Sequence, residues 1–167
     1  YFSERDVAIS SLLFRVGASI EEIFSLNKEN FRLDGDILSL EISHKRKPRK
    51  VSTNYKDFYE FNSIKNYEDN LSKAEEKLSK KTSQSNPLFL NKFGTRLTGR
   101  SFRRLLMKYG KKTGFGEINP LTLTTSNIYN LYKQNVRNEE IAARTGLTRG
   151  HINQRILVLS NQKERFK

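Results

Sequence analysis

Apolar side chains recur every three or four residues near the start of the chain and again through its second half, a spacing that predicts amphipathic helices. Residues 3–16 are predicted to form a first helix that Gly17 ends, with a buried side made of Val7, Ala8, Leu12, Leu13 and Val16. Ser19 is predicted to cap a second helix over residues 19–27, because its side-chain oxygen can accept a hydrogen bond from a free backbone N–H.

Between these helical regions the pattern changes to alternation, which predicts strands. Apolar and polar positions alternate around Phe31 and Leu33 and again over residues 37–42, on either side of the turn sequence Asp34-Gly35-Asp36. A basic segment over residues 45–50 follows and leads into a predicted third strand. This part of the chain therefore indicates a small antiparallel sheet.

The rest of the chain is again helical in pattern. Residues 66–81 predict a charged, peripheral helix with few apolar positions, and residues 82–87 predict a loop. Thr98 can cap a helix over about 99–112, whose predicted core stripe is Phe102, Leu105, Leu106 and Tyr109. Three short helices follow, over about 123–134, 138–144 and 149–159. The expected fold is a single domain over residues 1–167, mainly α with a small antiparallel β-sheet.

Positive charge is concentrated in the second half of the chain. The whole chain has a formal net charge of +13 at pH 7. Residues 1–88 hold 15 basic and 14 acidic residues, whereas residues 89–167 hold 16 and 4. One-sided basic charge favours a polyanion partner, nucleic acid before membrane, and a merely solubilising surface is the alternative.

Residue types that are missing or rare exclude several kinds of site. The chain has no Cys and only two His residues, so disulfides and thiolate metal sites are excluded, and we expect neither a metal nor a cofactor. No apolar run approaches the roughly 20 residues that span a bilayer, which favours a cytoplasmic protein associated with the bacterial nucleoid. The start at Tyr1 suggests a fragment of a longer protein.

The segment from Glu139 to Ile152 predicts a helix-turn-helix. Ala142 is small where two helices would cross, and Gly146 supplies a left-handed turn before Ile152 anchors the second helix. The start of that helix could enter the major groove, with the candidate contact residues Thr148, Arg149, His151, Asn153 and Gln154. An ordinary helical corner packed in a core is the alternative interpretation.

The chain from Arg5 to about Leu159 resembles the catalytic domain of tyrosine recombinases, the module of phage integrases and chromosome-dimer resolution enzymes. Val16-Gly17-Ala18-Ser19 looks like the family's opening segment, in which Gly precedes a catalytic Arg by two residues. The run from Leu88 through Thr98 and the basic helix to Asn119-Pro120 follows the family closely. The resemblance implies the fold of that catalytic domain, without the N-terminal core-binding domain that completes the family's clamp around DNA.

The resemblance also implies where the family's catalytic residues would stand, and other residue types occupy those positions. In chain order the family's Arg, Lys, His, Arg, His or Trp, and nucleophilic Tyr fall at Ser19, His44, Leu121, Thr124, Leu147 and Ile156. The Lys position is ambiguous, because Lys45 is adjacent to His44. The Tyr attacks phosphorus while the Arg and His groups hold the charged oxygens of the transition state. Removing one such donor typically costs about 10²–10³ in rate. We therefore expect no strand cleavage, so the chain is not expected to be an enzyme.

A domain that keeps the fold but not the chemistry would still hold DNA. The expected function is sequence-specific binding of double-stranded DNA, as a transcriptional repressor of a prophage or mobile element that controls lysogeny. The alternatives are an active or partner-assisted recombinase and an architectural or interaction partner of one, with self-association through residues 162–167. Besides the helix-turn-helix residues, the expected DNA contacts are Lys45, Arg46, Lys47, Arg49, Lys50, Arg96, Arg100, Arg103, Arg104 and Arg155.

Overall fold

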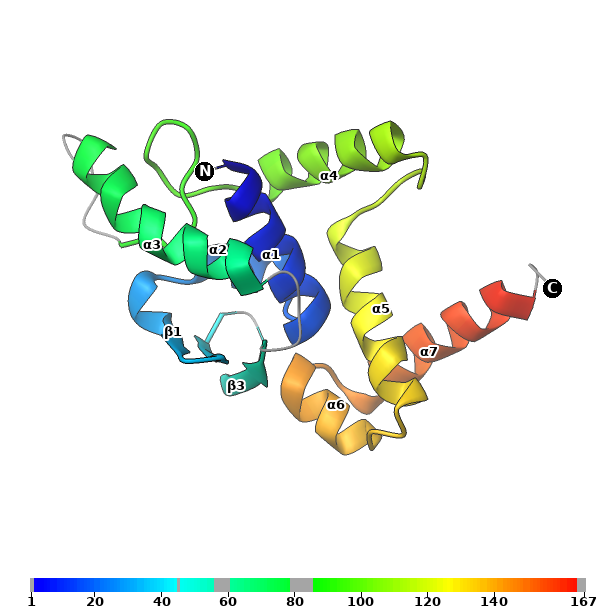
Figure 1. Cartoon of the computed structure of the whole chain (residues 1–167). Coiled ribbons are helices and arrows are strands. Elements are labelled where there is room, and N and C mark those ends of the chain that lie inside the picture. Colours follow the sequence, from blue (N-terminus) through cyan, green and yellow to red (C-terminus); the bar gives the residue numbers. More distant parts are fainter. Residues whose placement is uncertain (1, 45, 56–60, 79–85, 165–167) are drawn as a thin grey trace.

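The computed structural model describes residues 2–44, 46–55, 61–78 and 86–164, and Figure 1 shows their arrangement. Helices dominate, and three strands form one small sheet, as the sequence predicts. The elements, in chain order, are α1 (Phe2–Val16), α2 (Ile20–Ser25), η1 (Lys28–Asn30), β1 (Phe31–Asp34), β2 (Ile37–Ile42), β3 (Arg49–Asn54), α3 (Phe61–Leu78), α4 (Gly99–Thr113), α5 (Pro120–Lys133), α6 (Asn138–Thr145) and α7 (Arg149–Glu164).

Helix α1 lies at the centre of the domain and contacts α2, α3, α5 and β3. Its apolar face carries Ile9 and Leu13, both fully buried in the larger of two apolar clusters. The predicted capping of α2 by Ser19 is confirmed: Ser19 Oγ accepts from the backbone N–H of Glu22 at 3.3 Å, and the Glu22 carboxylate accepts from the Ser19 N–H at 2.7 Å.

The three strands pair antiparallel in the order β1-β2-β3. Leu33 stands opposite Leu38 across the predicted turn, and Leu40 stands opposite Val51 on the third strand. Because side chains alternate between the two faces of a strand, Leu38, Leu40 and Ile42 all point into the larger cluster. The hairpin and the third strand were therefore correctly predicted.

Two predicted helices differ from the observed ones. The charged helix expected at 66–81 begins earlier, at Phe61, and it is not merely peripheral, because Ile64 and Tyr67 are buried where α3 packs against α1. The prediction that Tyr109 belongs to the core stripe of α4 is wrong: its side chain is 42% exposed, whereas Phe102 and Leu106 are buried. Thr98 caps α4 as expected.

Helices α5, α6 and α7 form a second, smaller apolar cluster around Ile128, Ile141, Ile152 and Ile156. Helix α5 begins at Pro120 rather than near residue 123, because Asn119 caps it and proline suits the first helical position. The left-handed turn predicted at Gly146 is present, with φ of +67°. Among the described residues, no helix has both the length and the apolar character to cross a membrane.

Candidate functional site

Three of the six positions where the recombinase resemblance places catalytic residues lie together in one pocket of about 490 Å³. Ser19 comes from the start of α2, and Leu121 and Thr124 come from the first turns of α5. Three arginines from distant parts of the chain also line this pocket: Arg46, Arg103 and Arg155. The fold thus brings the first, third and fourth of these positions into one place and surrounds them with positive charge.

Arg155 is the least satisfied cation of this pocket. Its Nη1 is buried and has no hydrogen-bond partner. Burial lowers the pKa of Arg155, and the like charge of Arg46 lowers it further, although an arginine remains protonated at neutral pH. A buried donor without an acceptor is costly, so the pocket favours an anion that can accept from it.

The start of α5 adds to the positive potential of the pocket. Asn119 and Pro120 line it, and the Asn119 side-chain oxygen accepts from the backbone N–H of Thr122 at 2.9 Å. The free N–H groups at a helix N-terminus carry a partial positive charge that attracts anions. Arginine side chains and a helix start therefore face the same volume, an arrangement that suits a phosphate group.

The same pocket offers little for catalysis. Both hydroxyl groups that line it have local partners: Ser19 Oγ accepts from the Glu22 N–H, and Thr124 Oγ1 donates to the Leu121 carbonyl at 3.1 Å. Among the described residues that line it, Glu21 is the one carboxylate, and it is 2.7 Å from Arg103 Nη2. The described lining residues also include no imidazole to act as a base and no tyrosine to act as a nucleophile.

The remaining three positions serve other parts of the molecule. Ile156 is 9% exposed and packs in the second apolar cluster, and Leu147 packs against the same cluster. His44 is exposed at the loop after β2. Two of them, however, lie near a pocket residue in the sequence, since Arg155 precedes Ile156 and Arg46 lies two positions after His44.

A buried carboxylate holds the basic hairpin against the rest of the domain. Glu22 is fully buried, and its two carboxylate oxygens accept from Arg49 Nη1 at 2.7 Å and Nη2 at 3.3 Å. Arg49 Nε also donates to the Arg144 carbonyl at 2.8 Å. Arg46 Nη1 donates to the Thr145 carbonyl at 2.7 Å and lies 3.4 Å from the Glu22 carboxylate. Burial lowers the pKa of Arg46, against the opposing effect of Glu22.

The described basic residues that were predicted to contact DNA differ in their surroundings. Arg49 faces inward, and Arg96 donates to the carbonyls of Phe24 and Leu26, so both make bonds within the fold, as Arg46 also does. Arg155 is half-buried in the pocket. The exposed group is Lys47, Lys50, Arg100, Arg103 and Arg104. Lys50 lies 3.8 Å from Glu41, an ion pair in which both side chains remain exposed. Lys45 lies outside the described residues.

The predicted helix-turn-helix residues lie on α6 and α7, two helices joined at Gly146. Arg149 Nη2 is 2.8 Å from the Glu139 carboxylate, and the Asn153 side chain accepts from Asn138 at 2.9 Å. Thr148 Oγ1 lies 3.0 Å from His151 Nδ1, and Gln154 is exposed. These contacts are compatible with either interpretation, because exposed pairs of this kind can open toward DNA or simply hold a helical corner.

Sequence reasoning missed the convergence of Arg46 and Arg155 with Ser19 and Thr124. Arg46 lies in the loop between β2 and β3, Arg155 on α7, Ser19 at the cap of α2 and Thr124 on α5. No local sequence pattern connects these four positions. The one available signal was the proximity of each arginine to a position of the catalytic pattern, at spacings of one and two residues.

Comparisons with known proteins agree with this geometry. The Phage integrase family matches residues 2–156. Similar solved structures include XerA recombinase (TM-score 0.72, 16% identity, 99% of this chain and 57% of the other). XerH site-specific recombinase bound to difH substrate follows (TM-score 0.70, 18% identity, 91% and 42%). A third is the Tn1549 transposon integrase in complex with a circular intermediate DNA (TM-score 0.63, 17% identity, 89% and 52%).

No curated protein matches the chain. The chain spans about half the length of the solved structures that it resembles. At identities of 16 to 18%, these structures establish the fold of a tyrosine recombinase catalytic domain. The family match covers nearly the whole chain, from the first turn of α1 to Ile156 on α7. This protein therefore belongs to the phage integrase family.

Proposed function

We propose that this chain binds duplex DNA without cutting it and that it acts as a transcriptional repressor of a prophage or another mobile element. The observation that supports the proposal is the composition of the pocket at Ser19 and Thr124: its described lining residues include three arginines and no tyrosine. Such a pocket can hold a backbone phosphate, and its two hydroxyl groups have no neighbouring base among the described lining residues to activate them.

The solved relatives support duplex DNA as the partner. XerH is described with its difH substrate, and the Tn1549 integrase with a circular intermediate DNA. By analogy, the exposed cations on β3 and α4 would lie along the phosphate backbone, and Arg155 would meet one phosphate in the pocket. We assign Arg49 and Arg96 to the fold, because their guanidinium groups bond to the protein itself.

Salt dependence tests the phosphate contacts. Each phosphate neutralised by a Lys or Arg releases condensed counterions, so log affinity should fall linearly with log salt. Labelled duplex DNA is titrated at several salt concentrations with the wild type and with a variant lacking Lys47 and Lys50. The variant should give a shallower slope, by about one unit for each lost contact. A flat plot for the wild type would mean that the charge only solubilises the chain.

Trapping of covalent intermediates tests the loss of cleavage. The full-length protein is incubated with nicked suicide substrates, which retain any protein that attacks the strand. We expect no protein–DNA adduct, because Ile156 occupies the position of the nucleophile. A shifted band that protease removes would overturn the proposal in favour of an active recombinase. A band that forms only when an active recombinase is added would favour a partner-assisted enzyme.

Sequence reading is tested by two matched arginines. Arg149 on α7 and Arg103 on α4 each form an exposed ion pair with a glutamate, at 2.8 and 2.7 Å. If α7 is a recognition helix, Arg149→Ala should reduce the difference in binding free energy between specific and random DNA by about 1–3 kcal/mol. Arg103→Ala should weaken the binding of specific and of random DNA equally. Genomic occupancy of the full-length protein supplies the specific site. Uniform losses in both variants would make α6 and α7 a structural corner.

Self-association is a second candidate property, favoured by the far end of α7. Leu157 is 60% exposed and Val158 is 49% exposed, on a helix whose C-terminal end extends away from the other helices (Figure 1). Adjacent exposed apolar residues suit a protein contact. The segment 162–167 was predicted to exchange between protomers, and residues 165–167 lie outside the described residues. Sedimentation of the wild type and of Leu157→Asp tests the contact: equal masses would exclude it.

A further inference from the structure

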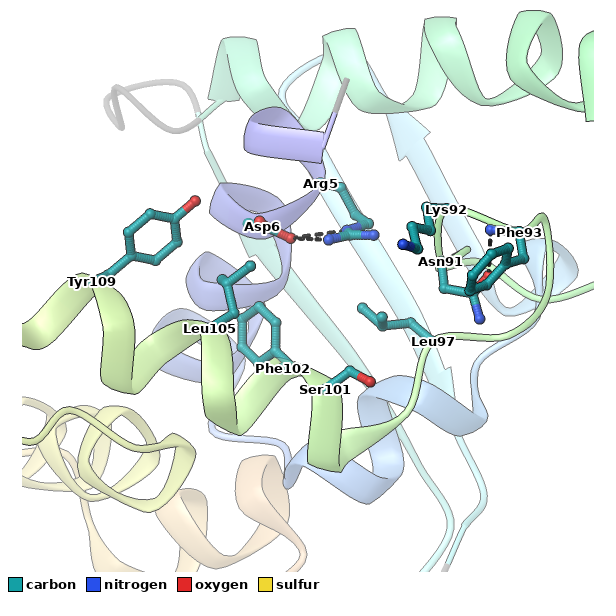
Figure 2. Close-up of a pocket in the computed structure, with 10 residues that line it drawn as sticks. All are labelled: Arg5, Asp6, Asn91, Lys92, Phe93, Leu97, Ser101, Phe102, Leu105 and Tyr109. Atoms are coloured by element: carbon teal, nitrogen blue, oxygen red, sulfur yellow. Dashed lines mark hydrogen bonds and ion pairs between the residues drawn. The ribbon is translucent and has the colours of Figure 1, made fainter.

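A second pocket, of about 500 Å³, lies between α1, the loop before α4 and α4 itself (Figure 2). The pocket at Ser19 and Thr124, which Arg46, Arg103 and Arg155 line, is called the arginine pocket here. None of the described lining residues of the second pocket belongs to it. Its walls are mainly apolar, formed by Phe93, Leu97, Phe102, Leu105 and Tyr109. Ligand pockets in proteins have volumes of about 300–1,000 Å³ and mostly apolar walls with few polar groups, and this pocket fits both criteria.

The rim of the pocket presents an aromatic ring on a well-fixed turn. Phe93 is 72% exposed, and its backbone N–H donates to the Asn91 side chain at 2.8 Å. The same side chain accepts from the N–H of Thr95 at 3.2 Å, and the Asn91 N–H donates to the Thr95 carbonyl at 2.8 Å. With Tyr109 on the opposite side, the turn supplies exposed aromatic surface at the mouth of the pocket. Such surface next to a cavity suits a planar apolar molecule.

The charges of the lining determine the sign of the ligand. Among the described lining residues Asp6 is the one carboxylate, and its Oδ1 accepts from Arg5 Nε at 2.8 Å and Nη2 at 2.6 Å. This pair is buried and neutralises itself. The remaining charge is the exposed ammonium of Lys92, which lies 4.9 Å from the centre of the Phe93 ring. An anionic group on the ligand would therefore be attracted to the mouth of the pocket.

We propose that this pocket binds a small aromatic anion, with its ring against Phe93 and Leu97 at one end of the pocket and its carboxylate or sulfonate beside Lys92. The assignment is independent of the DNA-binding proposal, because the two pockets share no residue. Ser101 stands exposed on the α4 side of the pocket and offers a position at which the volume can be filled without disturbing the core.

The test uses two probes that differ in charge: anilinonaphthalene sulfonate and the neutral N-phenyl-naphthylamine. Fluorescence titration of the wild type should show saturable binding of the sulfonate at one site. Ser101→Trp, which fills the pocket, should reduce that affinity at least about tenfold. Lys92→Ala should weaken the sulfonate about threefold to fivefold, the size of an exposed ion pair, and should leave the neutral probe unchanged. Lys50→Ala, on β3, is the matched charge control and should change neither.

Several results would overturn the proposal. Equal sulfonate affinity in the wild type and Ser101→Trp would mean that the probe binds elsewhere. Equal losses in Lys92→Ala and Lys50→Ala would mean that overall charge attracts it. Displacement by inorganic phosphate at constant ionic strength would assign the site to simple anions. Phe93→Ala removes an exposed ring and should keep the fold, so it provides a second variant if Ser101→Trp does not melt cooperatively; unchanged binding in that variant would also contradict the assignment.

Discussion

The Arg49 guanidinium lies 2.7 Å from a carboxylate oxygen of Glu22, and both side chains are almost completely buried. The pair joins the last strand of the sheet to the first turn of α2, and Arg49 extends the connection to the end of α6 through the Arg144 carbonyl. The Glu22 carboxylate also accepts a hydrogen bond from the backbone N–H of Ser19. A single carboxylate thus connects α2 with the segment that carries Arg46 and Arg49, and two of these parts, at Ser19 and Arg46, line the arginine pocket.

Removing the charge of Glu22 should destabilise the domain strongly. Glu22→Gln leaves Arg49 and Arg46 without their counterion, and a broken buried pair costs about 3–5 kcal/mol. Urea unfolding measures the change. The control is Glu21→Gln, whose carboxylate forms an exposed pair with Arg103 and should cost less than about 1 kcal/mol. Similar losses in the two variants would mean that Glu22 contributes through its capping bond alone.

Gly146 should be replaceable only at a high cost. A Cβ there would lie 2.7 Å from Arg49 Nη1, at a backbone φ of +67°. Gly35 has a comparable φ of +55°, and a Cβ there would have nothing within 4 Å. Gly35→Ala therefore measures only the cost of a left-handed backbone for alanine, about 1–2 kcal/mol of unfolding free energy. Gly146→Ala should cost at least about 1 kcal/mol more, because Arg49 must move from its partners. Equal unfolding free energies for the two variants would contradict this close contact.

Arg155 should oppose stability while it supports DNA binding. Arg155→Met keeps the aliphatic stem and removes the buried guanidinium whose Nη1 has no partner. We expect the free energy of unfolding to rise by about 1–3 kcal/mol and the salt slope of DNA binding to fall by about one unit. Thermal melts and titrations on the same samples measure both. If stability and affinity both fell, Arg155 would be a packing residue rather than a phosphate contact.

Restoring the tyrosine at position 156 should not restore cleavage. Ile156 is 9% exposed within the second apolar cluster, and a larger ring there should cost about 1–3 kcal/mol by overpacking. The family's other catalytic positions would still lack their Arg and His residues. Ile156→Tyr should therefore melt at a lower temperature and give no covalent adduct on suicide substrates. An adduct from this variant would show that the pocket retains phosphate activation.

The regular elements were predictable because their signals are local. The Ser19 cap, the hairpin at Gly35 and the left-handed Gly146 each depend on a few neighbouring residues, and all three are present. The errors concern tertiary packing. Tyr109 has the right spacing for the stripe of Phe102 and Leu106, yet it lies at the mouth of a pocket, and periodicity cannot show how far a neighbouring element extends.

Nothing in the sequence indicated how the candidate site is assembled. The family resemblance singled out Ser19, Leu121 and Thr124 one by one, and the fold places them in one pocket. It could not show that Arg46 and Arg155 both line that pocket, nor that Arg46, Arg49 and Arg96 bond to the protein itself. Whether a cation faces solvent or a backbone carbonyl depends on three-dimensional contacts. The sequence alone does not distinguish an arginine that faces solvent from one that bonds to the protein.

Under the proposal that the catalytic residues have been lost, the roles of Ser19 and Ile156 in the fold limit how cleavage could be regained. Ser19 closes the capping box of α2, and Ile156 fills the second apolar cluster. A substitution toward the residues of the active recombinases would remove a cap at the first position and overpack the cluster at the second, before any other catalytic group was present. Each first step back would lower stability without an immediate gain in activity. On this proposal, cleavage could not return one substitution at a time without a loss of stability at each of these two positions.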